Sequence, residues 1–137
     1  MSTITQDSKR VLVADDDPII RRLVTSAVLR EGFEIVVVND GREAYRILQS
    51  DANFKAAIFD MMMPHLEGLD IIRFMKTEKR LMRIPAMIIT SEQNLKLMSD
   101  SFSAGASLFL RKPFTSEQLQ ATLRILLSTS SPTRKAA

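Results

Sequence analysis

The feature that most constrains the fold is a regular alternation of short apolar runs with segments of helical periodicity along the 137 residues. Each run is only about four residues long and rich in β-branched side chains, and it lacks the polar alternation of a half-exposed strand. Such runs predict strands that are covered on both faces. The runs are residues 11–14, 35–38, 56–59, 86–89 and 108–110.

The segments that follow the runs have the apolar spacing of amphipathic helices. Asp17 can cap the first helix and Gly32 can close it, Asp40 and Thr115 begin capping-box patterns, and the fourth helix should end near Gly105. The expected apolar stripes are Ile20, Leu23, Val24, Ala27 and Val28; Ala44, Ile47 and Leu48; Leu69, Ile72 and Met75; Leu95, Met98 and Phe102; and Leu119, Leu123, Leu126 and Leu127.

Strand and helix alternate five times, which predicts an α/β fold. Each helix is then the crossover between parallel strands, and the result is a three-layer sandwich. Five strands are too few for an eight-stranded barrel. The pattern defines one domain over residues 10–128. Residues 1–9 and 129–137 have little to bury, and we expect them to be disordered tails.

Composition excludes several classes of protein. The chain has no cysteine, so disulfides, iron–sulfur clusters and thiolate zinc sites are ruled out. No apolar run reaches the roughly 18 residues of a membrane span, and residues 1–10 hold no export signal, so we expect a cytoplasmic protein with no membrane partner. The net charge is +3, but the excess lies at the two ends of the chain, which argues against direct DNA binding.

Polar side chains gather where the predicted strands end. Asp15 and Asp16 follow the first strand, Asp60 the third, Thr90 the fourth and Lys112 the fifth. In open parallel sheets the carboxyl ends of the strands form one edge, which is where ligands bind. The sequence therefore predicts three carboxylates, a hydroxyl and an ammonium group at a single edge.

Carboxylates placed this close would raise one another's pKa unless a cation lies among them. Oxygen ligands without histidine or thiolate favour Mg²⁺, with Mn²⁺ as a second candidate, and a site of two or three carboxylates suits Mg²⁺. Lys112 and Thr90 match further oxygens of a phosphoryl group. Taken singly, Asp15 and Asp16 read as a solvated turn and Thr90 as a strand residue. Asp60, between apolar neighbours, is harder to explain that way.

Four segments occur in a characteristic order, and Gly68 lies between the second and third. The chain resembles the receiver domains of two-component response regulators, in particular the stand-alone kind typified by the chemotaxis response regulator. The resemblance implies a flavodoxin-like (βα)5 sandwich with strand order 2-1-3-4-5. The segments are VLVADDDP (11–18), FDMMMP (59–64), ITS (89–91) and AGASLFLRKPF (104–114).

The resemblance also implies roles for individual residues. Asp60 would accept a phosphoryl group from the phosphohistidine of a sensor histidine kinase or a phosphotransfer protein. Asp15 and Asp16 would hold Mg²⁺ together with Asp60 and the backbone carbonyl of Met62. Lys112 would bind the phosphoryl oxygens.

Signalling would use Thr90 as the switch hydroxyl and Phe109 as the switch aromatic residue, and the Lys112–Pro113 bond would be cis. Because position 109 is phenylalanine, no phenol can form a hydrogen bond when the ring turns inward. The responding surface would be the fourth helix, fifth strand and fifth helix, for partner binding or phosphorelay. It would include Lys96, Phe109, Arg111 and residues near Gln118.

Two other functions remain open. A haloacid-dehalogenase-like phosphatase also has an Asp-x-Asp at a strand end, which Asp15 and Asp17 match, but it needs a further acidic pair after the lysine, where only Glu117 is found. A receiver-like interaction module could retain the residues without using phosphate. His65 reads as a solvent-facing loop residue, not as a phosphoryl donor.

Overall fold

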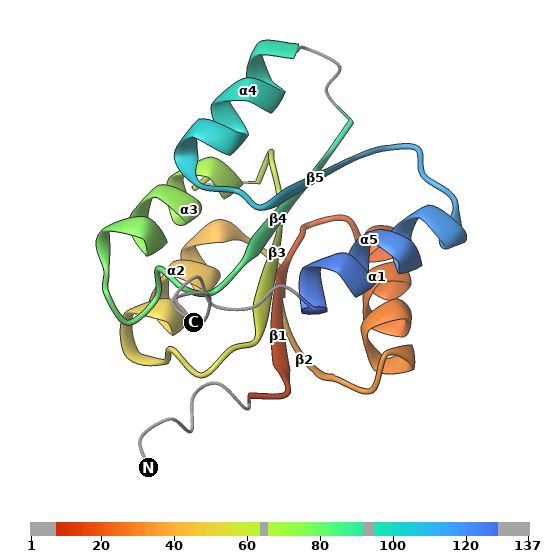
Figure 1. The fold of residues 1–137 in the computed structure, drawn as a ribbon, viewed down its shortest axis with the longest axis horizontal. Helices are drawn as coiled ribbons and strands as arrows, with labels where there is room; N and C mark the ends of the chain where they lie inside the picture. Colours follow the sequence, from red (N-terminus) through yellow and green to blue (C-terminus); the bar gives the residue numbers. More distant parts are fainter. Residues whose placement is uncertain (1–7, 64–65, 92–94, 129–137) are drawn as a thin grey trace, which may run out of the picture.

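A computed structural model describes residues 8–63, 66–91 and 95–128 (Figure 1). Strands and helices alternate as predicted, and none of the described helices is long and apolar enough to cross a membrane. The strands are β1 (Arg10–Ala14), β2 (Glu34–Val38), β3 (Ala56–Asp60), β4 (Ala86–Thr90) and β5 (Leu108–Arg111). The helices are α1 (Pro18–Arg30), α2 (Gly41–Ser50), α3 (Gly68–Thr77), α4 (Leu95–Ala104) and α5 (Ser116–Ser128).

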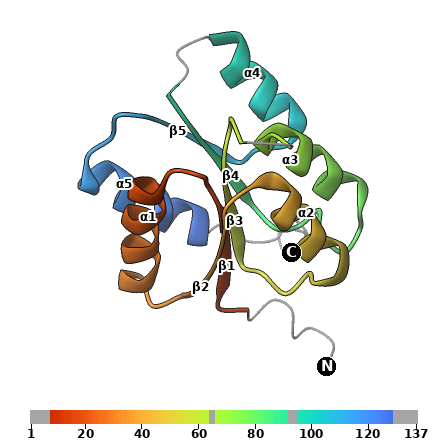
Figure 2. The same ribbon diagram turned by 180° about the vertical axis from the view of Figure 1, so that it is seen from behind.

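The five strands form one parallel sheet in the order β2-β1-β3-β4-β5. Helices α1 and α5 cover one face of the sheet, and α2, α3 and α4 cover the other (Figures 1 and 2). The predicted three-layer sandwich and its strand order are therefore confirmed. From β1 the chain moves first to β2 on one side and then to β3 on the other side of β1. The strand order therefore reverses between β1 and β3.

The sheet divides the core into two clusters. Successive side chains of a strand point to opposite faces, so neighbours in sequence enter different clusters. Phe59 and Ile88 pack under α2, α3 and α4, whereas Ile58 and Ile89 pack under α1 and α5. All four are buried, and β3 and β4 are covered on both faces, as their uninterrupted apolar sequences predict.

The predicted helix ends are confirmed at five places, including Asp40, whose side chain accepts a hydrogen bond of 3.0 Å from the amide of Glu43. The Asp17 side chain accepts a hydrogen bond from the amide of Ile19, and Gly32 follows the end of α1 with φ of 87°. Thr115 and Gln118 bond each other's backbone amides with their side chains, at 3.0 and 2.9 Å. Gly105 ends α4 with φ of 117°, a left-handed conformation that favours glycine.

Among the described residues of the predicted apolar stripes, two are exposed. Leu23 of α1 is 42% exposed and Phe102 of α4 is 47% exposed. In α4 the adjacent Ser101 takes the buried place, and its hydroxyl donates a hydrogen bond of 2.8 Å to the carbonyl of Leu97. The prediction for Phe102 was wrong because α4 lies beside the edge strand β5, where the sheet covers less of the helix.

Ser8 and Lys9, at the start of the described chain, make contacts with the rest of the domain. Residues 1–9 were predicted to be disordered, but Ser8 is buried, and its hydroxyl donates a hydrogen bond of 3.0 Å to the carbonyl of Asn53. The ammonium of Lys9 lies 5.4 Å from the ring centroid of Phe33. Residues 1–7 and 129–137 lie outside the described part of the chain.

Candidate functional site

The strand ends bring the predicted polar residues to one edge of the sheet. Asp15 and Asp16 follow β1, and Lys112 follows β5. Asp60 and Thr90 are themselves the last residues of β3 and β4, so these two strands run one residue further than the apolar runs indicated. β1, β3, β4 and β5 are consecutive in the sheet, which places all five residues along the same edge.

Three carboxylates meet at the point where β1 and β3 end. Oxygen atoms of Asp15, Asp16 and Asp60 all lie within 4.8 Å of one another. Asp15 and Asp60 are buried, at 2% and 7% exposed, whereas Asp16 is open to solvent. The backbone amide of Asp17 donates to Asp15 at 2.9 Å, and that of Met62 donates to Asp60 at 3.4 Å. The strand ends thus hold both buried carboxylates in fixed positions.

Burial dominates the electrostatics of this cluster. Burial first, and then the neighbouring Asp15 carboxylate, raise the pKa of Asp60 to about 7, against the opposing charge of Lys112. Burial also raises the pKa of Asp15. A divalent cation among the oxygens would stabilise both ionised forms. Three carboxylates without a histidine or sulfur ligand fit Mg²⁺ or Mn²⁺ by the chemistry of the donor atoms.

A cation and a hydroxyl flank the buried carboxylates. The ammonium nitrogen of Lys112 lies 3.9 Å from Oδ1 of Asp60, and the side chain is only 21% exposed. The backbone amide of Lys112 donates to the carbonyl of Thr90 at 2.8 Å, which joins the ends of β4 and β5. Thr90 is 1% exposed. The Lys112–Pro113 bond is cis, as the resemblance implied.

Two glycines support the segment that follows Asp60. The Gly68 amide donates to the carbonyl of Met61 at 3.2 Å, and a Cβ atom at position 68 would lie 2.6 Å from the Asp60 carbonyl oxygen. A Cβ atom at Gly41 would overlap the carbonyl oxygen of Leu66. No role for Gly41 was expected from the sequence. The one hint in the sequence was the presence of glycine, a poor helix former, in the first turn of α2.

Arg21 is a second residue of the site whose role was not predicted from the sequence. Its guanidinium donates a hydrogen bond of 2.9 Å from α1 to the backbone carbonyl of Asp15. This bond fixes the turn after β1 from one side. In the sequence, Arg21 is visible only as a basic residue one turn into a helix that follows an acidic loop. That pattern does not show whether its guanidinium binds a backbone carbonyl or faces solvent.

The other predicted site residues lie around this edge. The Met62 side chain is 53% exposed, and Phe109 is half-buried in β5. Lys96 pairs with Asp100 on α4 at 3.6 Å, and Arg111 is exposed at the end of β5. His65 lies outside the described residues.

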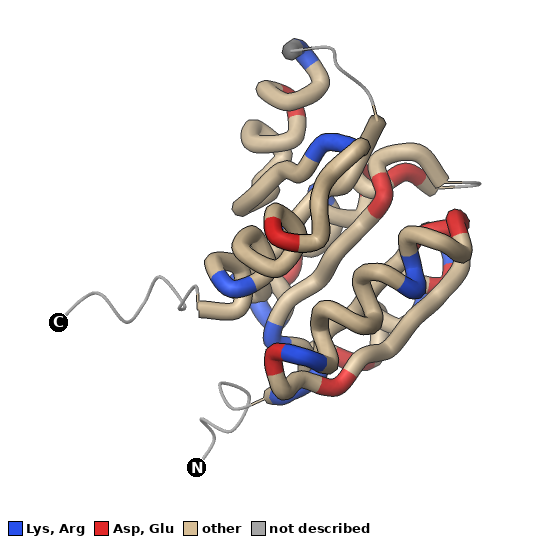
Figure 3. Tube along the Cα trace, turned by 90° about the vertical axis from the view of Figure 1, so that its right-hand side faces the viewer, with Lys and Arg blue, Asp and Glu red and all other residues tan. Residues whose placement is uncertain are grey.

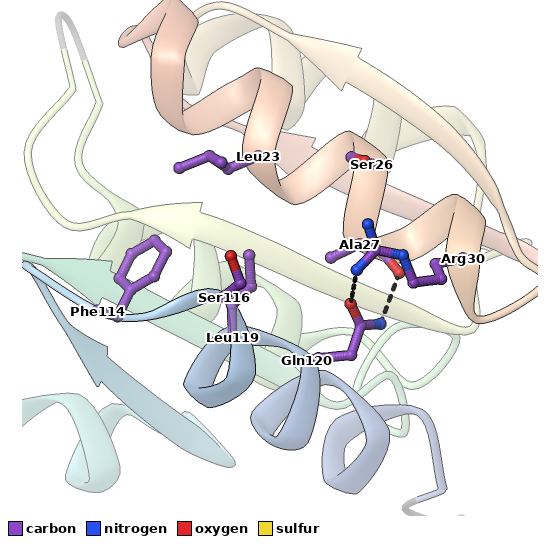
Figure 4. A pocket seen from close by; sticks show the side chains of 8 residues that line it. All are labelled: Leu23, Ser26, Ala27, Arg30, Phe114, Ser116, Leu119 and Gln120. Carbon is purple, nitrogen blue, oxygen red and sulfur yellow. Dashed lines mark hydrogen bonds between the residues drawn. The ribbon is translucent and has the colours of Figure 1, made fainter.

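A pocket lies between α1 and α5, away from the carboxylate cluster (Figure 4). Its volume is about 90 Å³. At one end Gln120 accepts a hydrogen bond of 3.2 Å from Arg30 and donates one of 3.0 Å to the carbonyl of Ala27. None of its lining residues belongs to the carboxylate cluster, so it does not contribute to that site. The lining residues are Leu23, Ser26, Ala27, Arg30, Phe114, Ser116, Leu119 and Gln120.

Comparisons with known proteins agree with this geometry. The family model described as response regulator receiver domain matches residues 11–124. Chemotaxis protein CheY1 of Helicobacter pylori is 32% identical over 122 residues, which cover 88% of this chain and 98% of that protein.

Solved structures give the same result. Chemotaxis response regulator CheY4 of Vibrio cholerae has a TM-score of 0.79 and 29% identity over 88% of this chain and 99% of its own. The receiver domain of sensor histidine kinase PA1611 from Pseudomonas aeruginosa, which has a magnesium ion coordinated in its active site cleft, has a TM-score of 0.77. It covers 89% of this chain and 99% of its own, but at 22% identity it shows the shared fold alone.

Proposed function

Because the chain belongs to the response regulator receiver domain family, we propose that Asp60 accepts a phosphoryl group from the phosphohistidine of a sensor histidine kinase or a phosphotransfer protein. Members of this family are phosphoacceptor signalling modules of two-component systems. The observation that carries the proposal is the placement of Asp60, buried at a strand end between two other carboxylates and a lysine.

The transfer forms a bond between an Asp60 oxygen and phosphorus and breaks the bond between phosphorus and the donor imidazole. Asp60 must be ionised to attack, and Lys112 favours that form because its ammonium lies 3.9 Å away. The same ammonium neutralises charge on the transferring oxygens.

Asp15, Asp16 and Asp60 would hold Mg²⁺, or Mn²⁺, with the backbone carbonyl of Met62. The bound ion supplies positive charge that offsets the carboxylates and the phosphoryl oxygens. The magnesium in the cleft of the Pseudomonas aeruginosa receiver domain supports this assignment.

The switch requires two contributions. Moving an equilibrium from 1:99 to 99:1 takes about 5.5 kcal/mol. A hydrogen bond from Thr90 to a charged phosphoryl oxygen supplies about 1.5 to 3 kcal/mol. Completing the burial of the Phe109 ring, which is already half-buried, supplies less than the about 1.5 to 3 kcal/mol of burying a fully exposed ring. Neither suffices alone, so Thr90 moves toward the phosphoryl group and Phe109 fills the space that it leaves. The surface of α4, β5 and α5 then changes, for partner binding or phosphorelay.

The surroundings of the site fit a cytoplasmic protein whose partners are proteins. Lys and Arg segments are interspersed with Asp and Glu segments over the described body (Figure 3). Charges of both signs interspersed along the chain argue against the clustered Lys and Arg residues that nucleic acid selects. We therefore expect neither direct DNA binding nor a membrane partner.

The haloacid-dehalogenase-like alternative requires the carboxylate of Asp17. That carboxylate caps α1 by accepting a 2.9 Å hydrogen bond from the Ile19 amide. Asp17 thus has a structural role, which favours Asp60 over an Asp-x-Asp site. The other alternative, a receiver-like interaction module that does not use phosphate, predicts that Asp60 takes up no phosphoryl group. Labelling of Asp60 therefore separates it from the proposal.

Incubation with radiolabelled acetyl phosphate and Mg²⁺ tests the proposal. The protein should take up one acid-stable, base-labile phosphoryl group, and Asp60→Asn should take up none. Asp100→Asn is the matched control, because Asp100 pairs with Lys96 on α4 away from the cluster. Equal labelling of Asp60→Asn would remove Asp60 as the acceptor. Loss of labelling in both variants would point to disrupted folding, which circular dichroism detects.

A further inference from the structure

The ring of Phe109 lies on the sheet face that α2, α3 and α4 cover. Phe109 is opposite Ile88 in the register of β4 and β5, and Thr90 is two residues beyond Ile88. Side chains two residues apart in a strand point to the same face. Phe109 is therefore the diagonal neighbour of Thr90. It is half-buried and packs against the core cluster of that face.

Phe102 of α4 packs against this ring. The two ring centroids are 6.4 Å apart and the ring planes are inclined by 49°, a geometry in which aromatic rings attract each other. Phe102 is itself 47% exposed, so little of its surface contributes to the core. Its position is nevertheless fixed, because the preceding Ser101 is fully buried and bonds the carbonyl of Leu97.

We propose that Phe102 is a positioning residue that holds Phe109 beside α4 and so opposes the switch. The inference rests on the proposed function, in which Phe109 turns toward the space left by Thr90. Such a turn separates the two rings. The attraction between them therefore stabilises the arrangement in the structure and is lost in the switched one.

Shortening Phe102 should shift the equilibrium toward the switched arrangement even without a phosphoryl group. The two equilibria are linked, so a shift toward the switched form must raise the affinity for a phosphoryl mimic by the same factor. An aromatic pair of this kind is worth a factor of about two to ten. Phe102→Leu keeps apolar bulk without the ring and should lie between the wild type and Phe102→Ala.

Fluorine NMR of protein labelled with fluorophenylalanine tests the inference. The Phe109 signal is assigned by its loss in Phe109→Leu. Spectra are recorded for the wild type, Phe102→Ala, Phe102→Leu and the control Met82→Ala, first alone and then during titration with beryllofluoride and Mg²⁺. Met82 is the matched control, because it is 45% exposed and lies in the segment between α3 and β4.

In the absence of the mimic, the Phe109 signal of Phe102→Ala should move toward the position that the wild type reaches only with beryllofluoride. The apparent affinity for beryllofluoride should rise about two- to tenfold, with no change in Met82→Ala. A Phe109 signal and an affinity equal to the wild type in Phe102→Ala would overturn the inference. Failure of the wild type to bind beryllofluoride would instead count against the proposed function. Even then, a Phe109 signal in Phe102→Ala that is unchanged from the wild type without the mimic would overturn the inference.

Discussion

The ammonium nitrogen of Lys112 lies 3.9 Å from Oδ1 of Asp60, although the two residues come from strands that are not neighbours in the sheet. β4 lies between β3 and β5, and the lysine reaches across its end. The hydrogen bond of 2.8 Å from the Lys112 amide to the carbonyl of Thr90 fixes the point from which the side chain reaches. This ion pair is the basis of the first prediction.

Replacing Lys112 by alanine should slow phosphorylation of Asp60 by about 10²-fold, because a preorganised charge is removed from the transferring oxygens. Mg²⁺ affinity should not fall, since the lysine is not a metal ligand. Stopped-flow labelling with acetyl phosphate measures the first quantity and calorimetry the second. Lys96→Ala is the control. A labelling rate within twofold of wild type would contradict this role.

Stability should depend on pH through Asp60. The pKa of Asp60 is about 7 in the folded chain, above its ordinary value of 3.8, so the folded state binds the proton more tightly than the unfolded state. Without divalent cations this group therefore lowers the free energy of unfolding as pH rises from about 4 to 7, and the full loss persists at higher pH. Asp60→Asn should be more stable than wild type above pH 7, by at most about 4 kcal/mol, and equal to it near pH 4.

Urea denaturation in EDTA at several pH values measures this difference. Asp51→Asn is a control of opposite sign, because the pKa of Asp51 is lowered. Burial alone would raise it, but the amide of Asn53 and the guanidinium of Arg10 outweigh burial. A stability gap between wild type and Asp60→Asn that stays constant from pH 4 to 8 would be inconsistent with the raised pKa of Asp60.

Added Mg²⁺ should stabilise the wild type by about 2.7 kcal/mol at a concentration one hundred times its dissociation constant. Asp15→Asn should lose most of this effect, because Asp15 is a buried oxygen donor of the cluster. Thermal unfolding with and without Mg²⁺ is the measurement, and Asp70→Asn, at an exposed position of α3, is the control. Stabilisation of Asp15→Asn equal to that of wild type would place the ion elsewhere.

Gly68→Ala should destabilise the fold by about 1 to 3 kcal/mol, because the new Cβ would lie 2.6 Å from the Asp60 carbonyl oxygen and must displace it. Mg²⁺ binding should weaken as well, since Asp60 moves with its carbonyl. Gly32→Ala is a contrasting variant: its strain comes from φ of 87°, with open space around the Cβ, and its Mg²⁺ affinity should be unchanged. Equal Mg²⁺ affinities in the two variants would show that Gly68 does not position Asp60.

Thr90→Ala should still be labelled by acetyl phosphate but should no longer move Phe109 when beryllofluoride binds. The hydroxyl is lost while the acceptor carboxylate stays. Thr90→Ser keeps the hydroxyl and should retain the response. The Phe109 fluorine signal is the readout, and a full shift in Thr90→Ala would refute the coupling.

The sheet and most helix ends could be predicted from sequence, because they depend on local pattern. The apolar runs place Asp15, Asp60 and Thr90 at strand ends within one residue. The features that were not predicted depend on contacts between segments that are far apart in the sequence. Phe102 has helical spacing like Met98, but burial in α4 depends on how far the edge of the sheet extends beneath it. Gly41 contacts Leu66, which lies 25 positions along the chain and cannot be paired with it by periodicity.

The sheet is one backbone thick, so the two core clusters do not share side chains. Phe109 packs only into the cluster beneath α2, α3 and α4, whereas Gln120 and Glu31 join α1 to α5 behind the opposite face. A repacking that starts at Phe109 can thus spread directly within one layer, and it reaches α5 only through strand β5, which both layers share. Helix α1 takes no part in the responding surface, so substitutions on its buried face should alter the stability of the fold more than the signal.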